Sequence, residues 1–320
     1  MADVTVSGLN VGNKEARWSD FRARKYLLRC VSIGILRLIC ALPLHWGLWI
    51  GKHLGRLLHR LMKTRRHITT VNIRLCFPEL SPEEQQQRVK EVFENNGIGL
   101  IETGWSYWKD ENVFRKITEF RHFDLLDRQL DQGNGVILMG WHFSCLDLAG
   151  LLFSLHGKPC STLYRKHDNP MLEWFFPSGR GRFSFPVERK KTRQMLRAMR
   201  NNHCIWYAPD QDLGRKGTAF VPFFGHPAAT TLATTKMHQL NNAPLIRLDC
   251  WRKPDNSGYI LECSEVEGFP SGSEEQDAVL INKSIEAGIR KAPSQYMWVH
   301  KRFKTTPSGE MNVYKKAKNT

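Results

Sequence analysis

The sequence has no Asp or Glu between Arg22 and Pro78, although twelve Lys or Arg side chains lie in the same stretch. The whole chain of 320 residues carries a formal net charge of +16. A surface without acids attracts polyanions, of which an anionic membrane face and nucleic acid are the two common kinds. Residues 26–51 are mostly Leu, Ile and Trp, which a phosphate-binding surface does not need. We therefore expect an anionic membrane surface as a partner and no nucleic acid.

A hydrophobic run long enough to be a clean transmembrane helix is also missing from this region. The charge-free run from Leu38 to Gly51 has 14 residues, and a bilayer span needs about 20. Arg29 and Arg37 interrupt the longer run, and Pro43 would kink it. No small-residue cleavage site follows, which argues against a secretory signal. We expect a helix embedded in, or steeply tilted through, the cytoplasmic half of the membrane; a single span with Arg29 reaching the interface is the alternative.

Several catalytic and metal-binding motifs are absent. The eight cysteines include no C-x-x-C pair, which favours reduced, buried thiols in a cytosolic compartment over disulfides or a zinc site. No G-x-S-x-G and no H-E-x-x-H is present, so the chain has neither a serine nucleophile elbow nor that zinc-protease signature. We expect no cofactor and no metal.

The chain divides into four predicted segments. Residues 1–21 are small and polar and are expected to be disordered, residues 22–75 form a basic apolar arm, residues 76–310 form one α/β domain, and residues 311–320 are a basic tail. A helix is expected to start at Ser81, because Pro82 occupies its first turn and Glu84 completes a capping box.

Short apolar runs alternate with helical patterns beyond residue 133. We expect strands at 135–140, 160–165, 203–210 and 244–251, and helices at 146–155, 190–200 and 230–241. Near-continuous apolar strands between helices are typical of a mixed, largely parallel sheet covered by helices on both faces.

Polar residues follow three of these strands. His142, Arg165 and Asp210 each lie at or just past a strand end, and ligands of open α/β sheets bind at that edge. If the strands are neighbours, the three side chains converge. Asp147 lies five positions after His142 and could fold back to orient the imidazole as a general base. The alternative is a structural role, in which both side chains cap the start of a helix.

The chemistry of this group points to a substrate that supplies its own hydroxyl, because no enzyme nucleophile accompanies His142. We expect Arg165 to neutralise a developing oxyanion. The pair Asp210 and Asp212 also fits a rival class, metal-dependent D-x-D glycosyl transfer to a membrane lipid. A non-enzymatic basic membrane or nucleic-acid binder is the third hypothesis. The residues expected to bind substrate are Asp210, Asp212, Arg180, Arg182, Lys301 and Arg302.

The motif from His142 to Asp147 resembles the H-x4-D signature of glycerolipid-type acyltransferases. Together with "NIRLCFPELSPEE", "LIETGWSYW", "LYRKHDNPMLEWF", "WYAPDQD", "FVPFFGHPAATT" and "APSQYMWVHKRFKT", it resembles the lipid A secondary acyltransferases of the lauroyl/myristoyl type, over about residues 26–306. These segments are most similar to the lauroyl-type member.

This resemblance implies transfer of a fatty acyl chain from acyl carrier protein to a 3-hydroxyacyl chain of Kdo2-lipid IVA. It places the enzyme at the cytoplasmic face of the Gram-negative inner membrane, attached by its N-terminal hydrophobic segment, with acyl carrier protein as donor and no cofactor. His142 and Asp147 would be the catalytic dyad, and Arg165 would lie in the family's Y-R block. Gln211 stands where the family's P-D-H-D loop commonly has a His.

Overall fold

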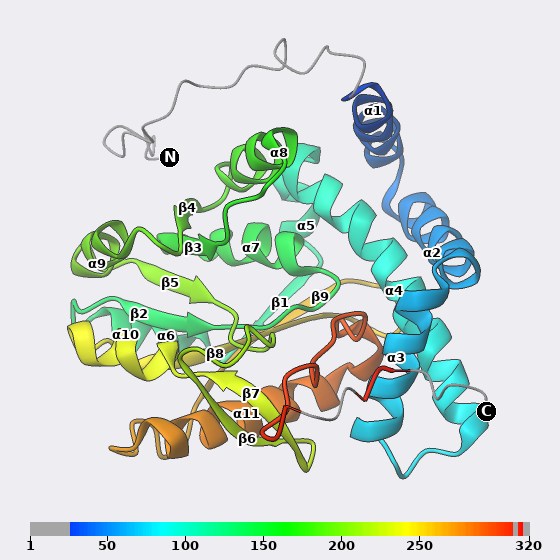
Figure 1. Cartoon of the computed structure of the whole chain (residues 1–320). Coiled ribbons are helices and arrows are strands. Elements are labelled where there is room, and N and C mark those ends of the chain that lie inside the picture. Colours follow the sequence, from blue (N-terminus) through cyan, green and yellow to red (C-terminus); the bar gives the residue numbers. More distant parts are fainter. Residues whose placement is uncertain (1–25, 310–312, 316–320) are drawn as a thin grey trace.

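A seven-stranded sheet lies at the centre of the computed structural model, which describes residues 26–309 and 313–315 (Figure 1). The strand order is β1-β9-β8-β2-β5-β3-β4, and all neighbours run parallel except β8 and β9. Its strands are β1 (Thr118–Arg121), β2 (Val136–Met139), β3 (Cys160–Tyr164), β4 (Phe185–Glu188), β5 (Cys204–Tyr207), β8 (Leu245–Arg252) and β9 (Tyr259–Glu265). A separate antiparallel hairpin joins β6 (Thr218–Phe223) to β7 (His226–Thr231).

Helices cover both faces of this sheet, with α7 on one side and α10 and α11 on the other (Figure 1). The predicted α/β class with a mixed, largely parallel sheet is therefore confirmed. The helices are α1 (Leu27–Ala41), α2 (Leu44–Leu61), α3 (Lys63–Cys76), α4 (Pro82–Trp108), α5 (Glu111–Arg115), α6 (Phe123–Leu130), α7 (Leu146–Ser154), α8 (Pro170–Arg180), α9 (Thr192–Arg200), α10 (Ala233–Asn241) and α11 (Glu274–Lys291), with a 3-10 turn at Pro293–Gln295.

The core strands follow the apolar runs of the sequence. All four residues of β2 are fully buried, because the strand has neighbours on both sides and helices above and below it. One predicted element was partly wrong: residues 226–231 form β7, and the helix expected from residue 230 begins at Ala233. The pairing of β7 with β6 supplies the hydrogen bonds that the sequence pattern assigned to a helix.

The helix expected at Ser81 is α4, which runs for 27 residues between the N-terminal helices and the sheet. The Ser81 hydroxyl accepts a hydrogen bond from the Glu84 backbone N–H, and the Glu84 carboxylate accepts one from the Ser81 N–H. This capping box satisfies two amide groups that the helix cannot bond internally.

The arm predicted at residues 22–75 folds as α1, α2 and α3 over its described part, with the break between α1 and α2 at Pro43. On α2 the buried residues are Gly47, Gly51 and Gly55, which lie against α4. Exposed apolar side chains gather on the remaining faces of α1 and α2, namely Leu27, Leu28, Val31, Ile35, Leu38, Trp46, Trp49, Leu57 and Leu61. None of the helices in the described residues is long and apolar enough to span a bilayer.

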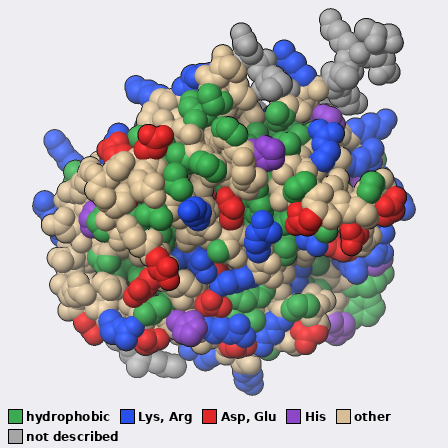
Figure 2. Space-filling model, turned by 90° about the horizontal axis from the view of Figure 1, so that it is seen from below, with side chains coloured by type: hydrophobic (Ala, Val, Ile, Leu, Met, Phe, Trp, Pro, Cys, Tyr) green, Lys and Arg blue, Asp and Glu red, His purple; other side chains and the backbone are tan. Residues whose placement is uncertain are grey.

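The positive bias of the arm does not extend over the whole molecule. Seen from below, the surface carries acidic and basic side chains interspersed with one another (Figure 2). The predicted disordered N-terminus at residues 1–21 lies outside the described residues, as does most of the predicted basic tail.

Candidate active site

The loop that follows β2 carries His142, and the C-terminal segment holds this loop in place. The Ser144 N–H donates to the Gln295 carbonyl over 2.7 Å, and the Met297 N–H donates to the His142 carbonyl over 2.9 Å. Phe143 also forms an isolated antiparallel bridge with Tyr296. Because backbone bonds on both sides fix the loop, the position of His142 depends on residues more than 150 positions away in the sequence.

His142 bonds to Asp210, which follows β5. The imidazole Nδ1 lies 2.7 Å from Asp210 Oδ1, and the His142 backbone N–H donates to Asp210 Oδ2 over 3.0 Å. The two residues meet because β2 and β5 are parallel neighbours, so their carboxyl ends share one sheet edge. A carboxylate accepts hydrogen bonds, so Nδ1 carries the proton and the lone pair of the neutral ring is at Nε2.

Burial and charge act in opposite directions on Asp210. Its side chain is only 1% exposed, and this burial alone would raise its pKa, but the charge and hydrogen bonds of His142 lower the pKa below its usual value. His300 lies beside this pair, and its Nε2 accepts a hydrogen bond from the Asp212 N–H. Burial lowers the pKa of His300 to about 4, so this second imidazole is neutral near pH 7 and adds no positive charge next to His142.

Asp147 does not orient His142 in this structure, and that part of the predicted dyad is corrected. Its Oδ1 accepts a hydrogen bond from Arg180 Nε over 2.7 Å, and its Oδ2 lies 3.5 Å from the Thr103 hydroxyl. Asp147 lies in the first turn of α7, which turns its carboxylate towards α8 and α4. Although burial would lower the pKa of Arg180, the attraction and hydrogen bond of Asp147 raise it, so the pair is ionic.

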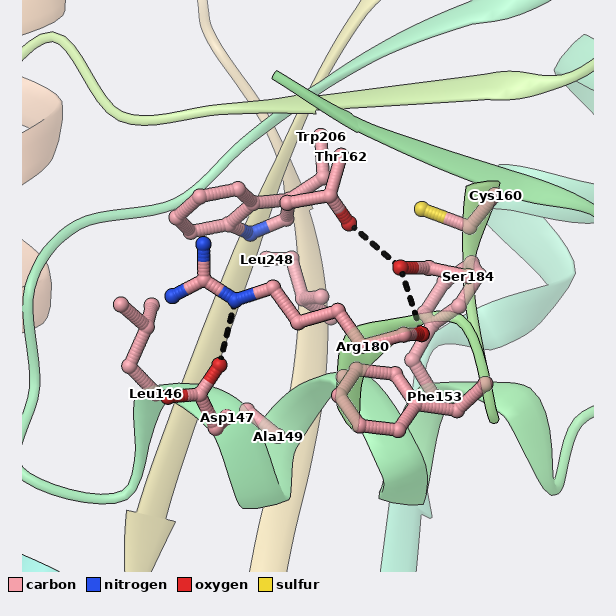
Figure 3. Close-up of a pocket in the computed structure, with 12 residues that line it drawn as sticks. Leu146, Asp147, Ala149, Phe153, Cys160, Thr162, Arg180, Ser184, Trp206 and Leu248 are labelled. Atoms are coloured by element: carbon pink, nitrogen blue, oxygen red, sulfur yellow. Dashed lines mark hydrogen bonds and ion pairs between the residues drawn. The ribbon is translucent and has the colours of Figure 1, made fainter. Parts of the chain in front are cut away.

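The pair of Asp147 and Arg180 borders a narrow cavity of about 30 Å³ under α7. Figure 3 shows Arg180 reaching from the end of α8 to Asp147, with Trp206 on the opposite side of the guanidinium. The Ser184 hydroxyl links the Thr162 hydroxyl to the Arg180 carbonyl. The other lining side chains are mostly apolar, among them Leu146, Phe153, Phe183 and Leu248.

Arg165 is not brought together with His142. It follows β3, which is separated from β2 by β5, and its side chain is 69% exposed. Its nearest acid is Asp168, 3.5 Å away and itself solvent-exposed. The expected convergence of three strand ends therefore holds for His142 and Asp210, the ends of adjacent strands, and does not extend to Arg165.

Two other residues predicted to bind substrate form hydrogen bonds within the protein. Asp212 is buried, and its carboxylate accepts hydrogen bonds from the Thr305 N–H and hydroxyl and from the Gly214 N–H. Arg302 is also buried and donates to the Ala229 carbonyl and the Thr230 hydroxyl. Most polar atoms of Asp212 and Arg302 are thus bonded within the protein, and binding of substrate by either residue stays a prediction.

Lys301 and Arg182 remain on the surface. The Lys301 ammonium lies 5.9 Å from the centre of the Tyr314 ring. Arg182 lines a groove beside α8 and donates weakly, over 3.4 Å, to the Ser106 carbonyl. Within the described ranges, no cluster of three or more His, Cys, Asp or Glu residues is arranged to hold a metal ion.

Sequence reasoning missed the residues that surround the His142–Asp210 pair. The Tyr296 hydroxyl points to the Asp210 carbonyl at 3.5 Å, and His300 contacts Asp212 from the same C-terminal segment. Tyr296 and His300 lie close in sequence to Lys301 and Arg302, which are expected to bind substrate. Only the weak signal of His and Tyr close together in one loop could have singled them out.

Comparison with known proteins gives consistent matches over this whole architecture. The family model for bacterial lipid A biosynthesis acyltransferases matches residues 15–305. The chain is 38% identical to the lipid A biosynthesis palmitoleoyltransferase of Escherichia coli K12, over 92% of this chain and 97% of that protein. It is 37% identical to the lauroyltransferase of the same organism, over 91% and 95% of the two chains. Identity to the E. coli myristoyltransferase is 22%, over 86% and 92%.

Proposed function

The chain belongs to the family of bacterial lipid A biosynthesis acyltransferases, and we propose that it moves a fatty acyl chain from acyl carrier protein to a hydroxyl of Kdo2-lipid IVA. The acceptor hydroxyl is that of a 3-hydroxyacyl chain. We further propose that the acyl group is lauroyl, as the resemblance of the sequence implies. The relatives named for palmitoleoyl and lauroyl transfer match at 38% and 37% identity, so identity does not decide the length of the acyl chain.

The hydrogen bond between His142 and Asp210 is the observation that carries this mechanism. With Nδ1 donating to Asp210, Nε2 takes the proton from the acceptor hydroxyl, and the oxygen attacks the thioester carbonyl carbon. The tetrahedral intermediate then collapses with cleavage of the carbon–sulfur bond. The thiolate of the carrier leaves and receives the proton that His142 holds, and an ester remains on the lipid.

The oxyanion of that intermediate needs positive charge nearby. The start of α7 follows directly after the His142 loop, and the N-terminus of a helix carries a partial positive charge. The ion pair of Asp147 with Arg180 lies at the same helix end. We assign Asp147 the task of holding Arg180 in place there. A role of Arg165 in transfer remains a prediction, which the turnover of Arg165→Ala would test.

The acyl carrier and the acceptor are both acidic, which suits the net charge of +16. We propose that α1 and α2 lie at the cytoplasmic face of the inner membrane, with Trp46, Trp49 and their exposed apolar neighbours in the lipid interface. This arrangement brings the enzyme to an acceptor that does not dissolve in water.

The rival function, metal-dependent glycosyl transfer through Asp210 and Asp212, is wrong. The chain belongs to an acyltransferase family, and the two carboxylates do not act as a pair in the structure. Asp210 bonds to His142, whereas Asp212 bonds to Thr305 and Gly214.

The test is acyl transfer by the purified chain, with acyl carrier protein thioesters of different lengths and Kdo2-lipid IVA in detergent. Mass spectrometry of the lipid should record the addition of one acyl chain. Asp210→Asn should lower turnover by roughly 10²–10⁴-fold, because the neutral amide no longer fixes the tautomer or stabilises the imidazolium. Wild-type turnover in this variant would remove the pair from the mechanism. A wild-type chain that transfers no acyl group to this acceptor would contradict the function itself.

A further inference from the structure

A second groove, larger than the cavity under α7, lies between α1, the end of α4 and α8. Its volume is about 530 Å³. Its walls are Ile33 and Gly34 of α1, Tyr107 and Trp108 of α4, and Trp174 and Phe175 of α8. A space of this size accepts part of an organic ligand, and its aromatic and aliphatic walls favour an apolar segment.

Two arginines line this groove, Arg37 from α1 and Arg182 just beyond α8. Neither forms an ion pair with an acidic side chain in the part of the chain that the structure describes. By contrast, Arg180 at the end of α8 is paired with Asp147. An apolar groove with two uncompensated guanidinium groups is complementary to an amphiphile that carries a phosphate.

The wall contributed by α1 indicates where this ligand comes from. Ile33, Gly34 and Arg37 line the groove, while Val31, Ile35 and Leu38 of the same helix expose large apolar side chains to the surroundings. A helix with apolar side chains on its outer face lies most favourably against lipid. A ligand that enters beside α1 therefore comes from the lipid surface, and not from a water-soluble carrier protein.

The inner wall of the groove borders the cavity under α7. The position of a Cβ at Gly179 would be 2.6 Å from the Tyr107 ring, and that ring stacks on Phe183, which lines the cavity under α7. Ser178 and Gly179 of α8 face the groove, whereas the next residue, Arg180, bonds to Asp147. One turn of α8 and one tyrosine thus separate the two spaces.

We propose that this groove binds the acceptor lipid, with Arg37 and Arg182 on its phosphate and the aromatic wall against one acyl chain. The inference rests on the proposed function, since it names where the acceptor of that reaction is held. Arg37 and Arg182 are binding residues for the acceptor and take no part in proton transfer at His142.

Gly34 offers a way to fill the groove without disturbing the fold. A Cβ placed there meets no atom within 4 Å, so Gly34→Phe adds a ring to the ligand space. Its matched control is Ile35→Phe, which places the same ring one position away on the exposed face of α1. For the arginines, the double variant Arg37→Gln/Arg182→Gln is compared with Arg29→Gln, an exposed arginine of α1 that does not line the groove.

Steady-state kinetics with Kdo2-lipid IVA in mixed micelles tests the proposal. Gly34→Phe and the double arginine variant should each raise the KM for this acceptor by roughly tenfold or more, with little change in kcat, because uniform binding is lost. Ile35→Phe and Arg29→Gln should keep the wild-type KM. An unchanged acceptor KM in both groove variants would overturn the proposal.

A binding measurement tests the acceptor site independently of acyl transfer. In the His142→Ala background, titration calorimetry with the intact acceptor and with acceptor that lacks its phosphates should record weaker binding of the latter. The double arginine variant should lose that difference. If removal of the phosphates weakens binding equally with and without Arg37 and Arg182, the arginines do not contact phosphate and the proposal fails. Absence of both binding and transfer in the wild-type chain would instead contradict the proposed function.

Discussion

The strand β2 and the helix α2 use the same kinds of apolar residue in opposite ways. All four side chains of β2 are fully buried, and each contributes to one continuous core. On α2 the buried residues are glycines, while Trp46, Trp49 and Leu57 are exposed by about half. Burial of one large apolar side chain stabilises the folded state by about 1.5–3 kcal/mol. The side chains of β2 provide this stabilisation, whereas the exposed side chains of α2 provide only part of it.

The glycines explain how α2 is held despite this. A Cβ at Gly55 would be 2.2 Å from the Phe93 carbonyl oxygen, and one at Gly97 would be 2.2 Å from the Gly51 carbonyl oxygen. Backbone packs on backbone between α2 and α4, so the large side chains of α2 are directed away from the protein. The core supports the site at the ends of β2 and β5, whereas α2 leaves its large apolar side chains exposed.

The largest effect is expected at the end of β2. His142→Ala should reduce acyl transfer by roughly 10²–10⁴-fold, the usual contribution of a general base. The thermal midpoint should fall, because the buried Asp210 carboxylate loses its imidazole partner and keeps only the hydrogen bond from the His142 backbone N–H. Transfer assays and circular dichroism on the same sample measure both quantities. A normal rate would show that the loop serves only to cap α7.

Asp147→Asn should act mainly on stability. Loss of the carboxylate leaves the guanidinium of Arg180 buried without its counter-charge, which costs about 3–5 kcal/mol. Urea denaturation measures this change. Asp168→Asn is the matched control, since its partner Arg165 and Asp168 itself are mostly exposed and such pairs contribute about 0–1 kcal/mol. Equal small losses in both variants would mean that burial does not distinguish the two pairs.

The exposed face of α2 should govern membrane association. Trp46→Ser and Trp49→Ser should each weaken binding to anionic vesicles about tenfold, from the ~1.5 kcal/mol lost per apolar side chain. Val113→Ser, a substitution at an exposed apolar residue of α5, should leave vesicle binding unchanged. Co-sedimentation of the purified variants with anionic vesicles measures this binding. If the double variant Trp46→Ser/Trp49→Ser binds vesicles as well as wild type, the lipid contact lies elsewhere on the protein.

Gly97→Ala should loosen the contact between α2 and α4. The added methyl group would overlap the backbone of Gly51 and Gly55, and overpacking of this kind costs about 1–3 kcal/mol. Gly34→Ala is the control, because nothing lies within 4 Å of its Cβ. Denaturant unfolding should separate the two variants. A Gly97→Ala protein as stable as wild type would mean that α2 shifts away from α4 at little cost.

The smallest effect concerns pH. Burial lowers the pKa of His300 to about 4, whereas the unfolded side chain titrates near 6.5. The unfolded chain therefore binds more protons, and the free energy of unfolding should fall as the pH decreases from about 6.5 to 4. Asp210, whose pKa is lowered, adds a further loss below its usual value. His300→Gln should reduce the slope between pH 6.5 and 4, as measured by urea midpoints, and an unchanged slope would assign it to other groups.

The sequence by itself determined some of the elements and the charge and apolar composition of each region. The capping residues Ser81 and Glu84 fix the start of α4 through local hydrogen bonds, and the apolar run at β2 requires burial wherever the strand lies. The acid-free stretch of the arm and the spacing of His142 and Asp147 are likewise properties of neighbouring residues. These signals are short-range, so they can be interpreted without knowing the rest of the fold.

Only the tertiary structure decided which carboxylate orients His142. Asp147 is nearer in sequence, but its place on the first turn of α7 directs it to Arg180, while Asp210 arrives because β5 pairs with β2. The groove beside α8 likewise exists only because α1 packs near the end of α4. Contacts of this kind join residues far apart in the chain, and they are fixed by strand order and helix packing, which no local pattern of residues specifies.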